Sequence, residues 1–169
     1  MMEYSFFSYP SPLGILNIRF TERGVLGISF LENEQNINNC NKAQVHDADL
    51  IVYKYLFKEL NNYFLGRLKK FEVPIILQGT EFQIKVWQEI LKIPYGESKT
   101  YGEIARSIGM PDSARAVGRA SHENKIPIII PCHRVIGVNG KLTGYASGLD
   151  KKQWLLKHEQ KHKEGEEIG

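Results

Sequence analysis

Two helix-start signals in the second half of the chain fix where helices there can begin. Thr80 with Gln83 forms one signal, and Thr100 with Glu103 forms the other. In each, a Thr hydroxyl and a Glu or Gln three residues later can satisfy the free N–H groups of a first helical turn. The first helix should end at Pro94-Tyr95-Gly96. Its inner face is the apolar stripe Phe82, Val86, Trp87, Ile90 and Leu91.

The second of these helices should stop at Gly109, and a third, capped by Asp112 or Ser113, should run to about Ser121. Helix, glycine turn and helix at this spacing are similar to a helix-turn-helix, although such pairs also occur in proteins that never touch DNA. The third helix is built of small residues and two arginines, a composition that allows close approach to a phosphate-lined groove. Tight helix packing with solvated arginines is the alternative.

The first half has a different pattern. Alternating residues 13–20 and 25–31 predict two strands of a hairpin, and residues 50–65 show helical spacing that ends at Gly66. Residues 71–77 predict a further strand, and residues 32–47, with Cys40, a polar loop. We therefore expect an α+β protein with a small mixed α/β domain at 1–78, followed by a mainly helical domain at 79–169.

Composition narrows the function classes. The chain has 169 residues and two cysteines, which argues against a disulfide scaffold and favours a reducing compartment, the cytoplasm. We expect no signal peptide and no membrane segment, because no run approaches about 20 apolar residues. The net charge of +3 resides in residues 79–169, with 14 basic and 11 acidic side chains, which permits an anionic partner.

Cys132 is the candidate reactive group. The run Ile128-Ile129-Ile130 leads to Pro131 and Cys132, and His133 and Arg134 follow. Nearby positive charge favours the thiolate, which is the nucleophilic form, so we predict an activated cysteine. A buried structural cysteine is the alternative. Beyond it, residues 137–141 predict a hairpin turn, residues 144–148 a small-residue loop, and Asp150 the cap of a last helix before a frayed end at 160–169.

The segment Pro131-Cys132-His133-Arg134-Val135 resembles the acceptor motif of the O6-alkylguanine-DNA alkyltransferases, also called methylated-DNA–protein-cysteine methyltransferases. Further motifs follow this family in order over about residues 79–160: Phe82-Gln83, Val86-Trp87, Ile93-Pro94-Tyr95-Gly96, Thr100 to Ala105, Arg115-Ala116-Val117-Gly118, Asn124, Pro127, Gly144-Tyr145 and Trp154-Leu155-Leu156. The resemblance implies a ribonuclease H-like sheet domain followed by a winged helix-turn-helix domain.

The resemblance also assigns chemistry. It implies that Cys132 accepts an alkyl group from O6 of guanine, or O4 of thymine, once per molecule. It makes His133 the base acting through a water, Glu159 its orienting carboxylate, and Tyr101 the donor to the departing guanine. Asn124 would hold the turn beside the cysteine, and main-chain groups of Cys132 and Val135 would read the guanine edge. The pocket walls would be Pro127, Tyr145, Ala146 and Ser147.

The partner implied is double-stranded DNA containing O6-alkylguanine, with the damaged nucleotide flipped out of the stack. Arg115 would fill the gap, and the DNA-facing positions would be Ala114, Ala116, Gly118 and Gly102. We expect a monomer with no obligate protein partner and no cofactor. Two features depart from the family pattern: Ser147, which would narrow the pocket against large adducts such as benzyl, and Glu123, which would weaken DNA binding. Cys40 and His46 are too few ligands for the zinc of some members, so no metal is expected.

Three other readings make different predictions. An alkyltransferase-like recognition protein would lack the acceptor cysteine. A helix-turn-helix regulator would give sequence-specific footprints and tolerate Cys132→Ser. A cysteine hydrolase would turn over acyl substrates.

Overall fold

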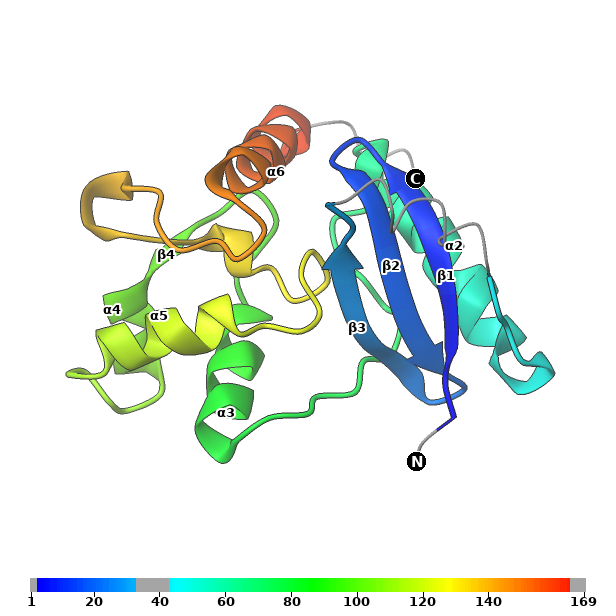
Figure 1. Ribbon diagram of the computed structural model, residues 1–169. Helices are drawn as coiled ribbons and strands as arrows, with labels where there is room; N and C mark the ends of the chain where they lie inside the picture. The colour runs from blue at the N-terminus through cyan, green and yellow to red at the C-terminus, as the bar shows by residue number, and fades with distance from the viewer. Residues whose placement is uncertain (1–2, 33–42, 165–169) are drawn as a thin grey trace. The chain divides into compact units, whose positions relative to one another are not determined.

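The computed structural model describes residues 3–32 and 43–164 (Figure 1). Cys40, most of the predicted loop at 32–47 and the last part of the predicted frayed end lie outside the described residues. Contacts divide the chain into Met1–Leu77 and Gln78–Gly169, and each unit has its own core. No helix of the described ranges combines the length and apolar character that a membrane crossing needs.

The N-terminal unit is an antiparallel sheet with one helix packed on a face. Strands β1 (Ser5–Ser11), β2 (Gly14–Thr21) and β3 (Gly24–Phe30) pair in the order β1-β2-β3. Helix α2 (Leu50–Phe64) follows a short 3-10 turn, η1 (Asp47–Asp49), and lies beside the sheet (Figure 1). Alternate strand residues and one face of α2 form the core: Phe7, Leu16, Ile18, Phe20, Leu56, Leu60 and Tyr63. The predicted hairpin and helix are present, and β1 adds a strand that was not predicted.

The predicted strand at residues 71–77 is wrong. Only Ile75 forms a bridge, parallel to Val25 of β3. Pro74 has no N–H to donate, and the buried Glu59 carboxylate takes the N–H groups of Glu72 and Val73 at 2.7–3.0 Å. These donors are therefore bound to a side chain of α2 and are not available to a sheet.

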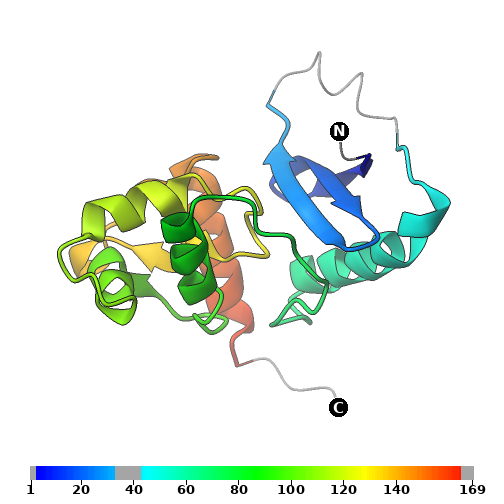
Figure 2. The same cartoon turned by 90° about the horizontal axis from the view of Figure 1, so that it is seen from below.

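The C-terminal unit contains α3 (Glu81–Ile90), α4 (Tyr101–Ser107), α5 (Ala114–His122) and α6 (Leu149–His162). These helices form one cluster in Figure 2, with α6 in orange and red. Both capping boxes are formed, at Thr80 and at Thr100, as predicted. Gly109, at φ +76°, ends the turn after α4. The Trp87 indole of α3 donates a hydrogen bond to the Ala120 carbonyl of α5 at 2.8 Å. The α+β class, with a sheet unit before a mainly helical unit, is confirmed.

The residues after α5 form short elements rather than a hairpin. Strand β5 (Val135–Ile136) follows the 3-10 turn η2 (Cys132–Arg134) and pairs in parallel with β4 (Lys99–Thr100). A second 3-10 turn, η3 (Val138–Gly140), is closed by the Gly137 N–H, which donates to the Lys141 carbonyl at 2.7 Å. The turn was predicted, but the hairpin was wrong, because the following segment forms no strand and its Thr143 carbonyl instead accepts side-chain hydrogen bonds.

Helix α6 also begins differently from the prediction. Its cap residue is Gly148, at φ +107°, and Asp150 lies in the first turn. Its buried positions are Lys152, Leu155, His158 and Glu159, so one face of this helix brings charged side chains into the interior.

Candidate active site around Cys132

The apolar run before Cys132 forms a tight turn around the Asn124 side chain. The Asn124 carboxamide oxygen accepts from the Ile126 N–H at 2.9 Å, and its amide nitrogen donates to the Ile130 carbonyl at 3.0 Å. Ile128 sits between them at φ +75°, a left-handed conformation that is rare for a β-branched residue. Because Ile126, Ile128 and Ile130 are each 1% exposed, their burial holds this strained segment in place.

Cys132 lies at the end of this turn and is only 6% exposed. The Asn124 amide donates to its Sγ at 3.1 Å. Burial raises the pKa of the Cys132 thiol, while the Asn124 hydrogen bond and the positive charge of Lys152 lower it by less. The resting protein therefore favours the thiol, and the expectation of a thiolate from the neighbouring His133 and Arg134 is wrong for this state.

His133 and Arg134 both contact Glu159, which lies on α6. The Nε2 atom of His133 is 2.8 Å from Glu159 Oε1. Arg134 donates to the same carboxylate from Nη2 at 2.7 Å and from Nε at 2.9 Å, and from Nη1 to the Ile93 carbonyl at 2.7 Å. The Gly96 N–H donates to Glu159 Oε2 at 3.3 Å. His133 and Glu159 are fully buried, so this carboxylate is shared inside the domain.

The charges in this network determine the protonation states. Burial lowers the pKa of His133, and Arg134 and Lys152 add to that effect, whereas Glu159 opposes it. Burial alone would raise the pKa of Glu159, but His133 and Arg134 outweigh it and hold that pKa well below its ordinary value. His133 is therefore neutral and Glu159 ionised near pH 7.

Lys152 is a further buried group that sequence reasoning missed. Its ammonium donates to the Val135 carbonyl at 2.6 Å and to the Thr143 carbonyl at 2.9 Å, and burial lowers its pKa to about 8. The Tyr101 hydroxyl donates to the same Thr143 carbonyl at 3.0 Å. One helix face contains Lys152, Leu155 and Glu159, which have the spacing i, i+3, i+7. This spacing could have predicted that Lys152 faces inward.

The remaining predicted pocket residues differ in burial. Tyr145 is 8% exposed, and its hydroxyl has no hydrogen-bond partner among the described residues. Burial raises the pKa of Tyr145 well above its ordinary value, and the nearby Cys132 adds to this. Pro127 is buried, Ser147 is half-buried, and Ala146 is exposed. None of these three residues takes part in the hydrogen bonds between Asn124 and Cys132 or between His133 and Glu159.

The predicted DNA-facing residues lie on α5 and at the start of α4. Val117 and Ala120 face the core, whereas Arg115 and Ala116 are exposed, and Ala114, Gly118 and Gly102 are half-buried. A Cβ added at Gly118 would lie 3.7 Å from the Tyr101 ring, so α5 approaches closely the residue that begins α4. Glu123, at the end of α5, accepts from the Gln83 side chain at 2.6 Å, which ties this carboxylate to α3.

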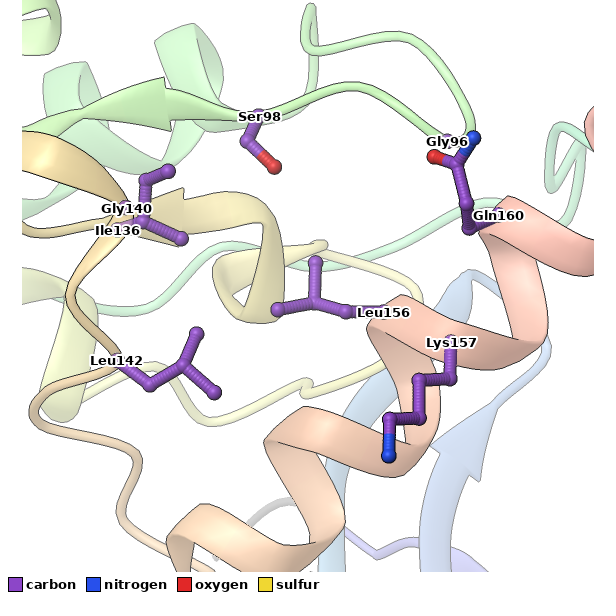
Figure 3. A pocket seen from close by; sticks show the side chains of 8 residues that line it. All are labelled: Gly96, Ser98, Ile136, Gly140, Leu142, Leu156, Lys157 and Gln160. Carbon is purple, nitrogen blue, oxygen red and sulfur yellow. The ribbon is translucent and has the colours of Figure 1, made fainter.

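A separate hollow of about 320 Å³ lies on the C-terminal unit and does not include Cys132 (Figure 3). Leu156 and Lys157 reach it from α6, and Ile136 and Leu142 line the opposite side. Gly96, at one end, is also the donor to Glu159, so the hollow adjoins the charged network. Within residues 3–32 and 43–164, no group of three His, Cys, Asp or Glu side chains could hold a metal ion.

The fold and site together define a two-domain protein in which a helix-turn-helix unit carries a buried cysteine beside a His–Glu pair. Comparison with known proteins identifies the class more closely. Residues 4–77 match the model of the 6-O-methylguanine DNA methyltransferase, ribonuclease-like domain, and residues 81–161 match that of the 6-O-methylguanine DNA methyltransferase, DNA binding domain. The chain belongs to this family, as its motifs indicated.

Individual relatives are similar to this chain over nearly its whole length. The methylated-DNA–protein-cysteine methyltransferase of Methanosarcina acetivorans is 46% identical over 94% of this chain and 98% of its own length. The crystal structure of Mycobacterium tuberculosis O6-methylguanine methyltransferase superposes with a TM-score of 0.82 at 38% identity, covering 97% of each chain. The structure of Mycobacterium tuberculosis OGT in complex with DNA gives a TM-score of 0.79 at 39% identity over 93% of each chain.

Proposed function

We propose that this protein repairs DNA by moving an alkyl group, such as methyl, from O6 of guanine to Cys132, and that each molecule acts once. The observation that carries the proposal is a buried thiol held by Asn124 and placed next to a His–Glu pair, in a chain of this family. A thioether forms at Sγ and the bond between the alkyl carbon and O6 breaks. No step regenerates the thiol, so transfer is stoichiometric.

The hydrogen bond between His133 and Glu159 supports a proton path. The Nε2 atom of His133 is engaged by Glu159, which leaves Nδ1 as the basic atom for the Cys132 proton. In the proposed mechanism that proton moves through a water, and Glu159 stabilises the imidazolium formed. The electron pair left on sulfur attacks the alkyl carbon, and the electrons of the broken bond remain on guanine.

Tyr101 is the proposed donor to the departing guanine. Burial raises the pKa of its phenol, so the hydroxyl keeps its proton at neutral pH, as a donor must. In the free protein that proton is directed to the Thr143 carbonyl at 3.0 Å. We infer that substrate takes this donor over, while Lys152 continues to satisfy Thr143.

The alkylated base would be flipped into a pocket walled by Pro127, Tyr145, Ala146 and Ser147, where the main chain of Cys132 and Val135 reads its edge. The exposed side of α5 would enter the minor groove through its small residues, and Arg115 would fill the gap in the stack. The relative solved in complex with DNA supports this partner. O4-alkylthymine is included in the proposal as a second substrate.

We also propose that the protein acts as a monomer in the cytoplasm, without cofactor or obligate protein partner. The two-cysteine composition supports a reducing compartment. Sedimentation analysis of the free protein tests the monomer directly, with a stable dimer as the contrary result.

A single-turnover assay read by mass spectrometry tests the proposed reaction. The protein is mixed with a short duplex that contains one O6-methylguanine, then digested, and the peptides carrying Cys132 and Cys40 are weighed. One methyl on the Cys132 peptide, never exceeding one per protein, is expected. Tight binding without a mass gain would place the protein among damage-recognition proteins, and a methyl on Cys40 would mean that the acceptor was misassigned.

A further inference from the structure

Arg134 is buried beside the His–Glu pair, yet the proposed mechanism gives it no task. It is 7% exposed, and its guanidinium makes bonds to both Glu159 oxygens and to the Ile93 carbonyl. It also lies over the Tyr95 ring, with its central carbon 5.6 Å from the ring centroid. These contacts fix the positive charge of Arg134 against the carboxylate that His133 also uses.

The sharing of this carboxylate has an electrostatic consequence. A fully buried carboxylate needs a positive partner, because an isolated charge in the interior is costly. With Arg134 present, Glu159 is neutralised whether or not His133 carries a proton. Without Arg134, the nearest cation available to Glu159 would be a protonated His133, at 2.8 Å. Arg134 therefore removes the main reason for His133 to become charged.

Among the other groups around His133, Lys152 acts in the same direction as Arg134, and Glu159 opposes both. Helix α6 contributes Glu159 and the buried Lys152, and the turn η2 contributes Arg134 and the neutral Cys132 thiol. Helix α3 also contacts η2, and its buried side chains Val86, Trp87 and Ile90 carry no charge. Two cations and one anion thus surround a fully buried imidazole, which opposes a further positive charge there.

The hydrogen bonding of the imidazole agrees with a neutral ring. Nε2 faces the Glu159 carboxylate and must carry its proton, whereas Nδ1 is buried and has no hydrogen-bond partner among the described residues. A second proton on Nδ1 would leave a buried charged donor without an acceptor, which is unfavourable. This geometry therefore favours an unprotonated Nδ1 and a neutral ring.

We propose that Arg134 is a positioning residue that holds His133 neutral and thereby keeps Cys132 a thiol until substrate occupies the site. Only one proton moves in this equilibrium, from Sγ to Nδ1, and the electron pair of the S–H bond stays on sulfur. The biological purpose of keeping Cys132 a thiol rests on the proposed function, because a cysteine that can be used only once is then protected from soluble electrophiles. The equilibrium itself can be tested without DNA.

The test measures the rate at which iodoacetamide alkylates Cys132 as a function of pH, by peptide mass spectrometry, with the Cys40 peptide as an internal reference. We compare wild type with Arg134→Gln, with Arg134→Lys, and with the double variant Arg134→Gln/Glu159→Gln. Arg134→Gln should react about tenfold faster at pH 7, equivalent to about one pKa unit of the thiol. Arg134→Lys keeps the charge and should stay near wild type, and the double variant should return to or below the wild-type rate.

An unchanged or slower rate in Arg134→Gln would overturn the proposal, and so would equal rates in Arg134→Gln and Arg134→Lys. If Arg134→Gln does not fold, Arg134→Lys is still compared with wild type, and nitrogen NMR of wild-type His133 tests the state that the proposal requires: a neutral ring protonated on Nε2 at pH 7, which an imidazolium contradicts. Methyl transfer from DNA is measured separately. Failure of that transfer in wild type would remove the proposed repair function while leaving the iodoacetamide result intact.

Discussion

Replacing Asn124 tests whether one side chain both shapes the turn before Cys132 and adjusts the thiol. In Asn124→Ala, the Ile126 N–H loses its 2.9 Å acceptor and the Ile130 carbonyl loses a 3.0 Å donor. Ile126 is 1% exposed, so water cannot readily replace the partner of its N–H. The Ile130 carbonyl keeps the Cys132 N–H at 2.8 Å. One unpaired buried donor and one weakened acceptor together should cost about 2 to 4 kcal/mol of unfolding free energy.

Asn124→Asp is the comparison variant, because it retains the acceptor for Ile126 but replaces the amide donor with a carboxylate oxygen that repels the Ile130 carbonyl. We expect a destabilisation comparable to that of the Ala variant, measured by urea unfolding. The thiol should distinguish the two variants: both raise the pKa of Cys132, and Asp raises it more, because a carboxylate replaces a donor 3.1 Å from Sγ. The pH profile of iodoacetamide alkylation reports this shift.

Two results would refute the reasoning. A loss below about 0.5 kcal/mol in Asn124→Ala, the size of an ordinary surface substitution, would mean that isoleucine packing alone holds the turn. An alkylation profile that does not move in Asn124→Asp would mean that the 3.1 Å contact has no influence on the thiol.

Three further outcomes are expected. Cys132→Ala should abolish methyl transfer yet retain binding to damaged duplex, which a gel-shift titration measures; residual transfer would identify another acceptor. Arg115→Ala should slow repair of duplex DNA far more than reaction with free O6-methylguanine base, and equal slowing on both substrates contradicts a role in flipping. Glu159→Gln should cost about 3 to 5 kcal/mol, because it leaves the Arg134 charge buried without its partner, and it should move Cys132 alkylation to higher pH. The pKa of Glu159 lies well below its ordinary 4.5, because His133 and Arg134 outweigh the opposing effect of burial. Its stabilising contribution is therefore present above pH 4.5 and lost in acid, and the variant should lack that part of the acid unfolding curve, whereas a wild-type-like curve refutes the pairing.

Local signals predicted the starts of α3 and α4. Thr80 and Thr100 each bond within three residues of themselves, so the capping boxes need no information from elsewhere in the chain. The segment 71–77 failed for the opposite reason. Its apolar residues indicated a strand, but the Glu59 carboxylate on the preceding helix α2 bound the N–H groups that a strand needs, a contact that local patterning does not show.

In the site, too, neighbouring residues predicted some features, and others depend on residues far away in the sequence. Cys132 could be selected as a candidate from its neighbours, but its protonation state depends on burial and on Lys152, which lies on α6. Adjacency in sequence suggested that Arg134 activates the cysteine, whereas in space its guanidinium is bound to Glu159. The roles of His133 and Glu159 came from the family resemblance, since no periodicity links residues 26 positions apart.

The dependence of the site on α6 has a consequence for the newly synthesised protein. Cys132 leaves the ribosome before Lys152 and Glu159, which lie on the last described helix. Until that helix packs against η2, the cysteine lacks the neighbouring cation Lys152, its base His133 lacks the Glu159 carboxylate, and Cys132 behaves as an ordinary exposed thiol. Packing of α6 and maturation of the reactive group are thus the same event, and chains truncated before α6 should carry a cysteine that no longer distinguishes damaged DNA from other electrophiles.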